Sequence, residues 1–174
     1  MHDPLQIIAI AGIPLLFYAA WRDVATRTIP DEISIAIAAL GLVVRSFDGW
    51  SAALLSMGVG ALVFILLLLL AMRGVLGGAD VKLAAALAIG LPPAATWDFI
   101  FLSVLCGGVL GVVYIITRRR YDPSRFMPPA LPNQFLLRRV LVAEARRLRR
   151  GGPLPYAVAI AVGGSFTLLT QVGT

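Results

Sequence analysis

The sequence predicts an all-α, polytopic membrane protein with about six transmembrane helices in a single domain over residues 1–174. First, 59% of the residues are hydrophobic and 14% are charged, whereas about a quarter of the residues in a soluble domain are charged. Second, several uncharged runs are long enough for a helix to cross a hydrocarbon core about 30 Å thick. Third, the basic residues lie between these runs and not on a recognisable nucleic-acid module, so we expect no nucleic-acid partner despite a net charge of +6.

The expected spans are apolar runs separated by polar or proline-containing connections. The first run ends before the polar stretch RDVATRTIPDE, and a second, shorter run follows it. The third contains LVFILLLLLAM, which no soluble surface helix would display. Pro92 and Pro93 divide the next apolar stretch in two because proline ends or kinks a helix, and the last run has a proline in its first turn. The predicted spans are 4–21, 31–46, 51–72, 80–92, 95–117 and 153–172.

The distribution of basic residues predicts how these spans are oriented. With six alternating spans, 14 of the 15 Lys and Arg residues fall on one side of the membrane, and Arg45 alone falls on the other. Lys and Arg accumulate in short cytoplasmic loops, so both termini are predicted to be external. The polar connections around Asp23 and Asp80 are then both on the cytoplasmic face.

The basic segment 118–152 separates the last two predicted spans. Within it, FLLRRVLVAEARRLRR mixes leucine and valine with clustered arginines. This pattern is typical of an amphipathic helix that lies in the membrane interface and binds anionic lipid headgroups. The alternative is a solvated loop that is retained as a determinant of topology.

Two aspartates adjoin the predicted spans, since Asp23 directly follows the first and Asp80 stands at the start of the fourth. Charged residues beside or within membrane segments are costly to insert and usually mark function. Two carboxylates held close together do not both ionise easily, so they share a proton, and one acts as a base while the other acts as an acid. This is the chemistry of an aspartic peptidase, which needs no nucleophilic side chain.

The same aspartates also have structural interpretations. Each could cap a helix or pair with Arg22, Arg27 or Lys82 near the interface. A serine–lysine peptidase dyad is a further alternative with Lys82, the only lysine, as its base, but the sequence points no serine at it. Cys106 lies in an apolar run and His2 at the terminus, so we expect no metal site and no disulfide.

Three blocks, WRDVATRTIPDEIS, LGGADVKLAAALAIGL and GGPLPYAVAIAVGG, resemble the type IV prepilin peptidases. The resemblance is to the short, TadV- or CpaA-like branch, which serves tight-adherence (Flp) pili. It implies that Asp23 and Asp80 are the catalytic aspartates. The second block follows the family's Gly-x-Gly-Asp pattern, except that Ala79 replaces the second glycine and fills space that a glycine leaves open. Other residues that the resemblance places around the active site or substrate are Gly77, Gly78, Lys82, Pro155 and Tyr156.

The resemblance implies an aspartic endopeptidase that removes the basic leader of prepilins and pseudopilins at the cytoplasmic face of the bacterial inner membrane. Larger family members add an N-terminal domain with paired Cys-x-x-Cys motifs that is associated with zinc and methylation; this chain lacks those motifs, so cleavage without methyltransferase activity and without a cofactor is expected. The implied partners are prepilin substrates, membrane lipids, and pilus or secretion assembly proteins. Two alternatives from other classes are a small transporter or proton pathway and a noncatalytic pilus-assembly factor.

Overall fold

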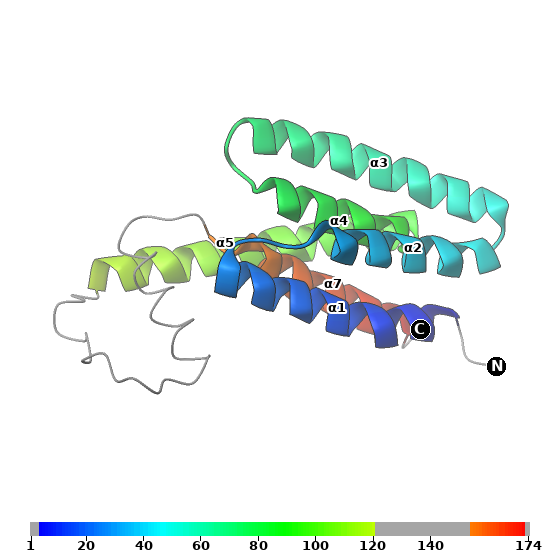
Figure 1. Cartoon of the computed structure of the whole chain (residues 1–174), viewed down its shortest axis with the longest axis horizontal. Helices are drawn as coiled ribbons and strands as arrows, with labels where there is room; N and C mark the ends of the chain where they lie inside the picture. Colours follow the sequence, from blue (N-terminus) through cyan, green and yellow to red (C-terminus); the bar gives the residue numbers. More distant parts are fainter. Residues whose placement is uncertain (1–3, 121–153, 173–174) are drawn as a thin grey trace.

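The computed structural model describes residues 4–120 and 154–172, which form helices and no strand (Figure 1). The prediction of an all-helical fold is therefore confirmed for the described residues, whereas most of the basic segment 118–152 lies outside them. The six described helices are α1 (Pro4–Thr26), α2 (Asp31–Phe47), α3 (Trp50–Met72), α4 (Gly78–Ile89), α5 (Pro93–Arg120) and α7 (Tyr156–Val172).

Helix α4 is the centre of the fold. It packs against α2, α3 and α7, while α1 packs against α2 and α7, and α5 packs mainly against α7 (Figure 1). Leu83 and Leu87 of α4 are fully buried, and a run of small alanines between and around them lets the neighbouring helices approach closely. At Gly41 of α2 a Cβ atom would lie 2.6 Å from the Gly90 Cα, so this crossing requires glycine.

Two helices have the length and composition to cross a membrane. These are α3, with 23 residues, and the 25-residue part of α5 from Pro93 to Thr117. Most of α3 faces outward, with exposed side chains such as Leu62, Ile65 and Leu69, as expected for contact with lipid. Helix α4 has 12 residues and is about 18 Å long, so it does not reach across a bilayer core by itself. The remaining spans and the orientation of the termini stay predictions.

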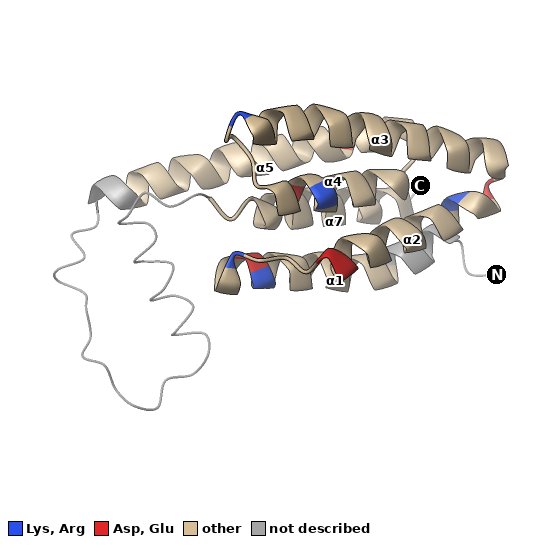
Figure 2. Ribbon diagram, turned by 45° about the horizontal axis from the view of Figure 1, so that its top comes forward, with Lys and Arg blue, Asp and Glu red and all other residues tan. Residues whose placement is uncertain are grey.

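Charged residues of the described helices lie near the helix ends, and the middle of α3 and of α5 carries none (Figure 2). One group surrounds the end of α1 and the starts of α2 and α4. Another lies at the opposite end of α4, where buried Arg45 pairs with Asp48 and its Nε donates a hydrogen bond to Ser56 Oγ at 3.0 Å. Ser56 Oγ in turn donates to the backbone oxygen of Leu91 at 3.2 Å. We call Arg45, Asp48, Ser56 and Leu91 the distal cluster.

Candidate active site

Asp23 lies within α1, not in a loop after it, because the helix continues beyond residue 21 to Thr26. The helix ends at Arg27, whose φ of +57° is left-handed and whose backbone N–H donates a hydrogen bond to the Asp23 carbonyl oxygen at 2.9 Å. Asp23 therefore occupies the last turn of α1. It is 8% exposed, so this helix end presents its carboxylate to the interior of the bundle.

Asp80 lies in the first turn of α4 and is also 8% exposed. Its carboxylate accepts a hydrogen bond from the backbone of Gly77, the residue that precedes the helix. A side chain three residues into a helix often reaches back to the cap in this way, so the structural interpretation of Asp80 as a capping residue is correct in part. Its Oδ1 atom, however, is buried and has no hydrogen-bond partner among the described residues. Capping thus leaves one acceptor of Asp80 available for chemistry.

The two aspartates interact electrostatically although they come from different helices. Asp80 stands at the end of α4, outside the two helices long enough to span a membrane. Burial and then the negative charge of Asp23 raise the pKa of Asp80 from 3.8 to about 7. The Gly77 hydrogen bond and the positive charge of Arg27 act in the opposite direction and lower it. The Asp80 carboxyl is consequently protonated in a large fraction of the molecules near neutral pH, and it feels the charge of a second carboxylate.

The glycines before Asp80 differ in what they contribute. A Cβ atom on Gly77 would lie 2.8 Å from Asp80 Oδ2, so the carboxylate occupies the space that a side chain would need. A Cβ on Gly78 would meet nothing within 4 Å. Neither glycine has a positive φ; the left-handed residue in this connection is Gly74, with φ of +74°. The left-handed turn in this connection is therefore made at Gly74, before Gly77 and Gly78.

Ala79, the residue that departs from the family pattern, fits its position without strain. It belongs to the first turn of α4, and it is not among the described residues with positive φ. Its side chain is partly buried and packs against the hydrophobic core. A glycine is therefore not required here for backbone conformation, and the methyl group adds apolar contact.

Lys82 does not pair with either of the two aspartates. Its Nζ contacts both carboxylate oxygens of Asp31, the first residue of α2, at 2.8 and 2.9 Å. The two side chains are 49% and 62% exposed. Sequence reasoning gave Lys82 a carboxylate partner as one option, but it did not single out Asp31, because the two residues are 51 positions apart.

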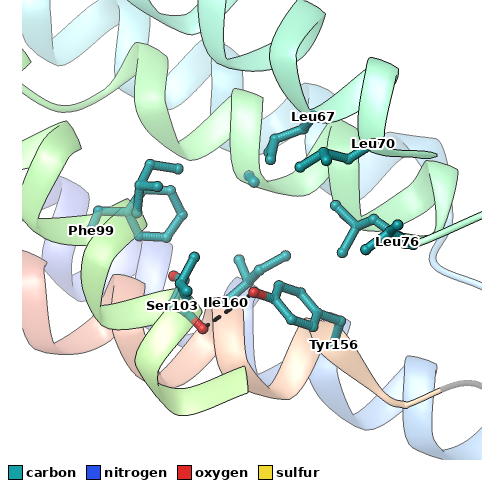
Figure 3. A pocket seen from close by; sticks show the side chains of 11 residues that line it. Leu67, Leu70, Leu76, Phe99, Ser103, Tyr156 and Ile160 are labelled. Carbon is teal, nitrogen blue, oxygen red and sulfur yellow. Dashed lines mark hydrogen bonds between the residues drawn. The ribbon is translucent and has the colours of Figure 1, made fainter. Parts of the chain in front are cut away.

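Tyr156 and Pro155 stand at the start of α7. Pro155 is buried, and Tyr156 is partly buried with its hydroxyl directed toward the Ser103 carbonyl oxygen at 3.5 Å (Figure 3). The Tyr156 ring occupies the space beside Gly107 of α5, where a Cβ would lie 2.5 Å from its Cε2 atom. The Asp80 charge also acts on Tyr156. The structure thus brings Tyr156, Asp80 and Asp23 to the same end of the bundle.

Tyr156 also lines an apolar pocket of about 120 Å³ between α3, α4, α5 and α7 (Figure 3). The pocket lies near Asp80, because Ala84, one turn further along α4, and Leu76, in the connection before Gly77, both line it. Its wall is aliphatic and aromatic apart from Ser103 and the tyrosine hydroxyl. Other lining residues are Leu67, Leu70, Val75, Phe99, Ile100, Val104 and Ile160.

Comparison with known proteins assigns the family. Residues 10–112 match the family model described as the type IV leader peptidase family. The chain belongs to the type IV leader peptidase family. A curated relative is the "Prepilin leader peptidase/N-methyltransferase" of Bacillus subtilis (strain 168), which is 27% identical over 164 residues. The alignment covers 92% of this chain and 54% of the relative, so the chain spans about half of that protein's length. No solved structure matches the chain.

The region of this leader peptidase family member that matches the family model runs from α1 into α5 and includes Asp23 and Asp80. Pro155 and Tyr156 lie beyond it. Among the described residues, no group of three His, Cys, Asp or Glu side chains is placed to hold a metal ion. Sequence reasoning gave no special role to the left-handed conformation of Arg27 or to the contact of Asp31 with α4, because neither has a local sequence signal.

Proposed function

We propose that the chain is a membrane aspartic endopeptidase that removes the basic leader of Flp-type prepilins and pseudopilins at the cytoplasmic face of the membrane. One observation carries the proposal: two buried carboxylates from α1 and α4 interact, and one of them keeps a buried oxygen without a hydrogen-bond partner among the described residues. Membership of the leader peptidase family supplies the reaction class.

In the proposed mechanism the Asp23–Asp80 pair holds one proton. The ionised carboxylate takes a proton from water as the water oxygen bonds to the peptide carbonyl carbon, and the protonated carboxyl donates to the carbonyl oxygen. When the tetrahedral intermediate collapses, the C–N bond breaks and the leaving nitrogen receives the proton that was taken from water. One hydroxyl of the intermediate returns its proton to the carboxylate that had acted as the acid, so the pair again holds one proton. The raised pKa of Asp80 supports this division of roles, because a large fraction of this carboxyl is protonated near neutral pH.

The substrate is proposed from the site's surroundings. The pocket beside Asp80 is apolar, and the outward faces of α3 and α5 are apolar as well, so the apolar segment of a membrane-inserted substrate can approach the carboxylates. A prepilin joins such a segment to a positively charged leader, which the positive-inside rule keeps on the cytoplasmic side. Cleavage between the two parts requires the carboxylates at the cytoplasmic end of the bundle.

The test is cleavage of a co-encoded pilin precursor by the purified chain in detergent or lipid, with the new N-terminus of the product read by mass spectrometry. Asp23→Asn and Asp80→Asn should each lower the rate by roughly a thousandfold or more, because each variant removes the acid or the base. Asp98→Asn, an exposed aspartate on α5, is the matched control and should cleave normally. Cleavage by either catalytic-site variant at the normal rate would overturn the proposal. The product mass also reports whether a methyl group is added.

A further inference from the structure

The helices that carry the two aspartates are held together indirectly. Helices α1 and α4 share at most a marginal contact, whereas α2 and α7 each pack against both of them. The spacing of Asp23 and Asp80 therefore depends on how α2 and α7 pack against α4, and α2 is the one of the two that follows Asp23 directly in the chain. The chain from Asp23 to α2 is short: α1 ends at Thr26, and α2 begins at Asp31.

The Asp31–Lys82 ion pair joins the start of α2 to α4 close to Asp80. Asp31 is the first residue of α2, and Lys82 is two residues beyond Asp80 on α4. Both carboxylate oxygens of Asp31 contact Nζ, so the contact fixes the start of α2 relative to the first turn of α4. Buried Ile33 and Leu83 belong to the core cluster beneath it. The ion pair thus fastens the two helices on the side that the core does not cover.

We propose that Asp31 is a positioning residue for the Asp23–Asp80 pair, and that it acts through Lys82 by holding the start of α2 against the start of α4. The inference rests on the proposed peptidase function for its effect on cleavage, but the geometry that it describes does not require cleavage. In this proposal neither Asp31 nor Lys82 contacts the reacting atoms.

The exposure of the pair limits the expected effect. Exposed ion pairs of this kind contribute little free energy, so losing one can change the population of the correctly spaced site by about 2- to 5-fold. Asp31→Asn and Lys82→Met should each lower kcat by about that factor and leave KM unchanged. Because the two side chains act as one unit, the double variant Asp31→Asn/Lys82→Met should be no slower than either single variant.

The matched control is Glu32→Gln. Glu32 stands beside Asp31 in the first turn of α2, is exposed, and forms no ion pair with a described residue. Its replacement removes the same charge from the same helix start, including the favourable interaction with the helix dipole. Glu32→Gln should therefore retain the normal kcat. The exchanged pair Asp31→Lys/Lys82→Asp should restore kcat to within about 2-fold, because a merely structural loss of Asp31 would not be reversed by a second charge change.

A second measurement decides the inference without relying on cleavage. The Asp80 carboxyl can be titrated by infrared spectroscopy of the full chain in lipid, with Asp80→Asn identifying its band. The neutral double variant leaves the net charge near the site unchanged, so a fall in the apparent pKa of Asp80 would report a larger separation from Asp23. We expect this fall in the double variant and not in Glu32→Gln.

Three results would overturn the inference: an unchanged Asp80 titration in the neutral double variant, single effects on kcat that multiply in the double, or an exchanged pair no faster than the singles. If the unmodified chain does not cleave the precursor, the proposed function fails, and the infrared titration still decides whether Asp31 positions the pair.

Discussion

The two ends of α4 hold buried charged residues that are used in opposite ways. At the distal cluster, Arg45 pairs with the Asp48 carboxylate and donates a hydrogen bond to the Ser56 hydroxyl. The Ser56 hydroxyl in turn donates a hydrogen bond to the Leu91 carbonyl oxygen. No buried side-chain atom of Arg45 or Ser56 lacks a partner among the described residues. At the other end, Asp80 is equally buried, but its Oδ1 has no such partner.

This difference separates structural from chemical use of a buried charge. A charge that is removed from water costs free energy unless it is paired, and the distal cluster offsets that cost by joining α2, α3 and the connection after α4. Asp80 does not offset it in the same way, since burial and the negative charge of Asp23 raise its pKa to about 7. A buried carboxyl such as Asp80, with a raised pKa and one oxygen without a partner among the described residues, is typical of an active site.

The largest effects are expected when one buried charged residue at each end of α4 is replaced by a neutral one. Asp80→Asn should abolish cleavage but leave the free energy of unfolding unchanged or slightly higher, because an amide oxygen can still accept the Gly77 hydrogen bond. Arg45→Met should do the reverse: the free energy of unfolding should fall by about 1–2 kcal/mol, because Ser56 loses its donor and Asp48 its partner, while cleavage continues in the folded fraction. Thermal unfolding in detergent and a cleavage assay measure both.

The expected loss of stability is no larger because the Asp48 side chain is 42% exposed and solvent screens its pairing with Arg45. A loss of stability in Asp80→Asn equal to that in Arg45→Met would remove the distinction between the two ends.

A smaller effect is expected from the backbone that presents Asp80. Gly77→Ala places a Cβ atom against Asp80 Oδ2, at 2.8 Å in the present geometry, so the carboxylate has to move. Because small displacements of a catalytic group are expensive, we expect cleavage to slow by roughly 10- to 100-fold. Gly78→Ala, one position further on and facing open space, is the control and should cleave normally. Equal rates for the two variants would show that the Gly77 side of the carboxylate is not constrained.

The helices themselves were largely predictable, because hydropathy and proline positions are local signals. The expected third span at 51–72 and the observed α3 differ only at the first residue, and Pro92 and Pro93 separate α4 from α5 as expected. The end of α1 was not predictable from these signals. Apolar residues stop near Trp21, but the helix continues until Arg27 adopts a left-handed conformation, which an arginine rarely takes.

The site was predictable in its two acids and less so in its supporting residues. Asp23 and Asp80 could be selected because a charge beside an apolar run is rare. The contacts of Asp31 with Lys82 and of Tyr156 with Gly107 join residues far apart in the chain, and only tertiary packing brings them together. The effect of Ala79 was likewise not predictable from the motif alone: the family pattern has a glycine there, whereas α4 already begins at Gly78 and Ala79 is a helical residue.

The smallest expected effect concerns the pH at which the two carboxyls work. Cleavage needs one proton on the pair, so kcat/KM should fall as pH rises through about 7, where Asp80 loses its proton. The same shift affects stability. The pKa of Asp80 is higher in the folded than in the unfolded chain, so its contribution is fully present below about 3.8 and is lost as pH rises through about 7.

Arg27→Gln tests which charges determine the pH at which kcat/KM falls. The Arg27 charge lowers the pKa of Asp80, so removing it should raise this pKa further and move the alkaline limb of kcat/KM to higher pH. Arg22→Gln makes the same change of charge one turn earlier in α1, but Arg22 is not among the charges that shift Asp80, so its profile should match the unmodified chain. Equal shifts for both variants would mean that the limb follows the overall charge of this end of the bundle. A shift to lower pH for Arg27→Gln would mean that the limb does not report the proton on Asp80.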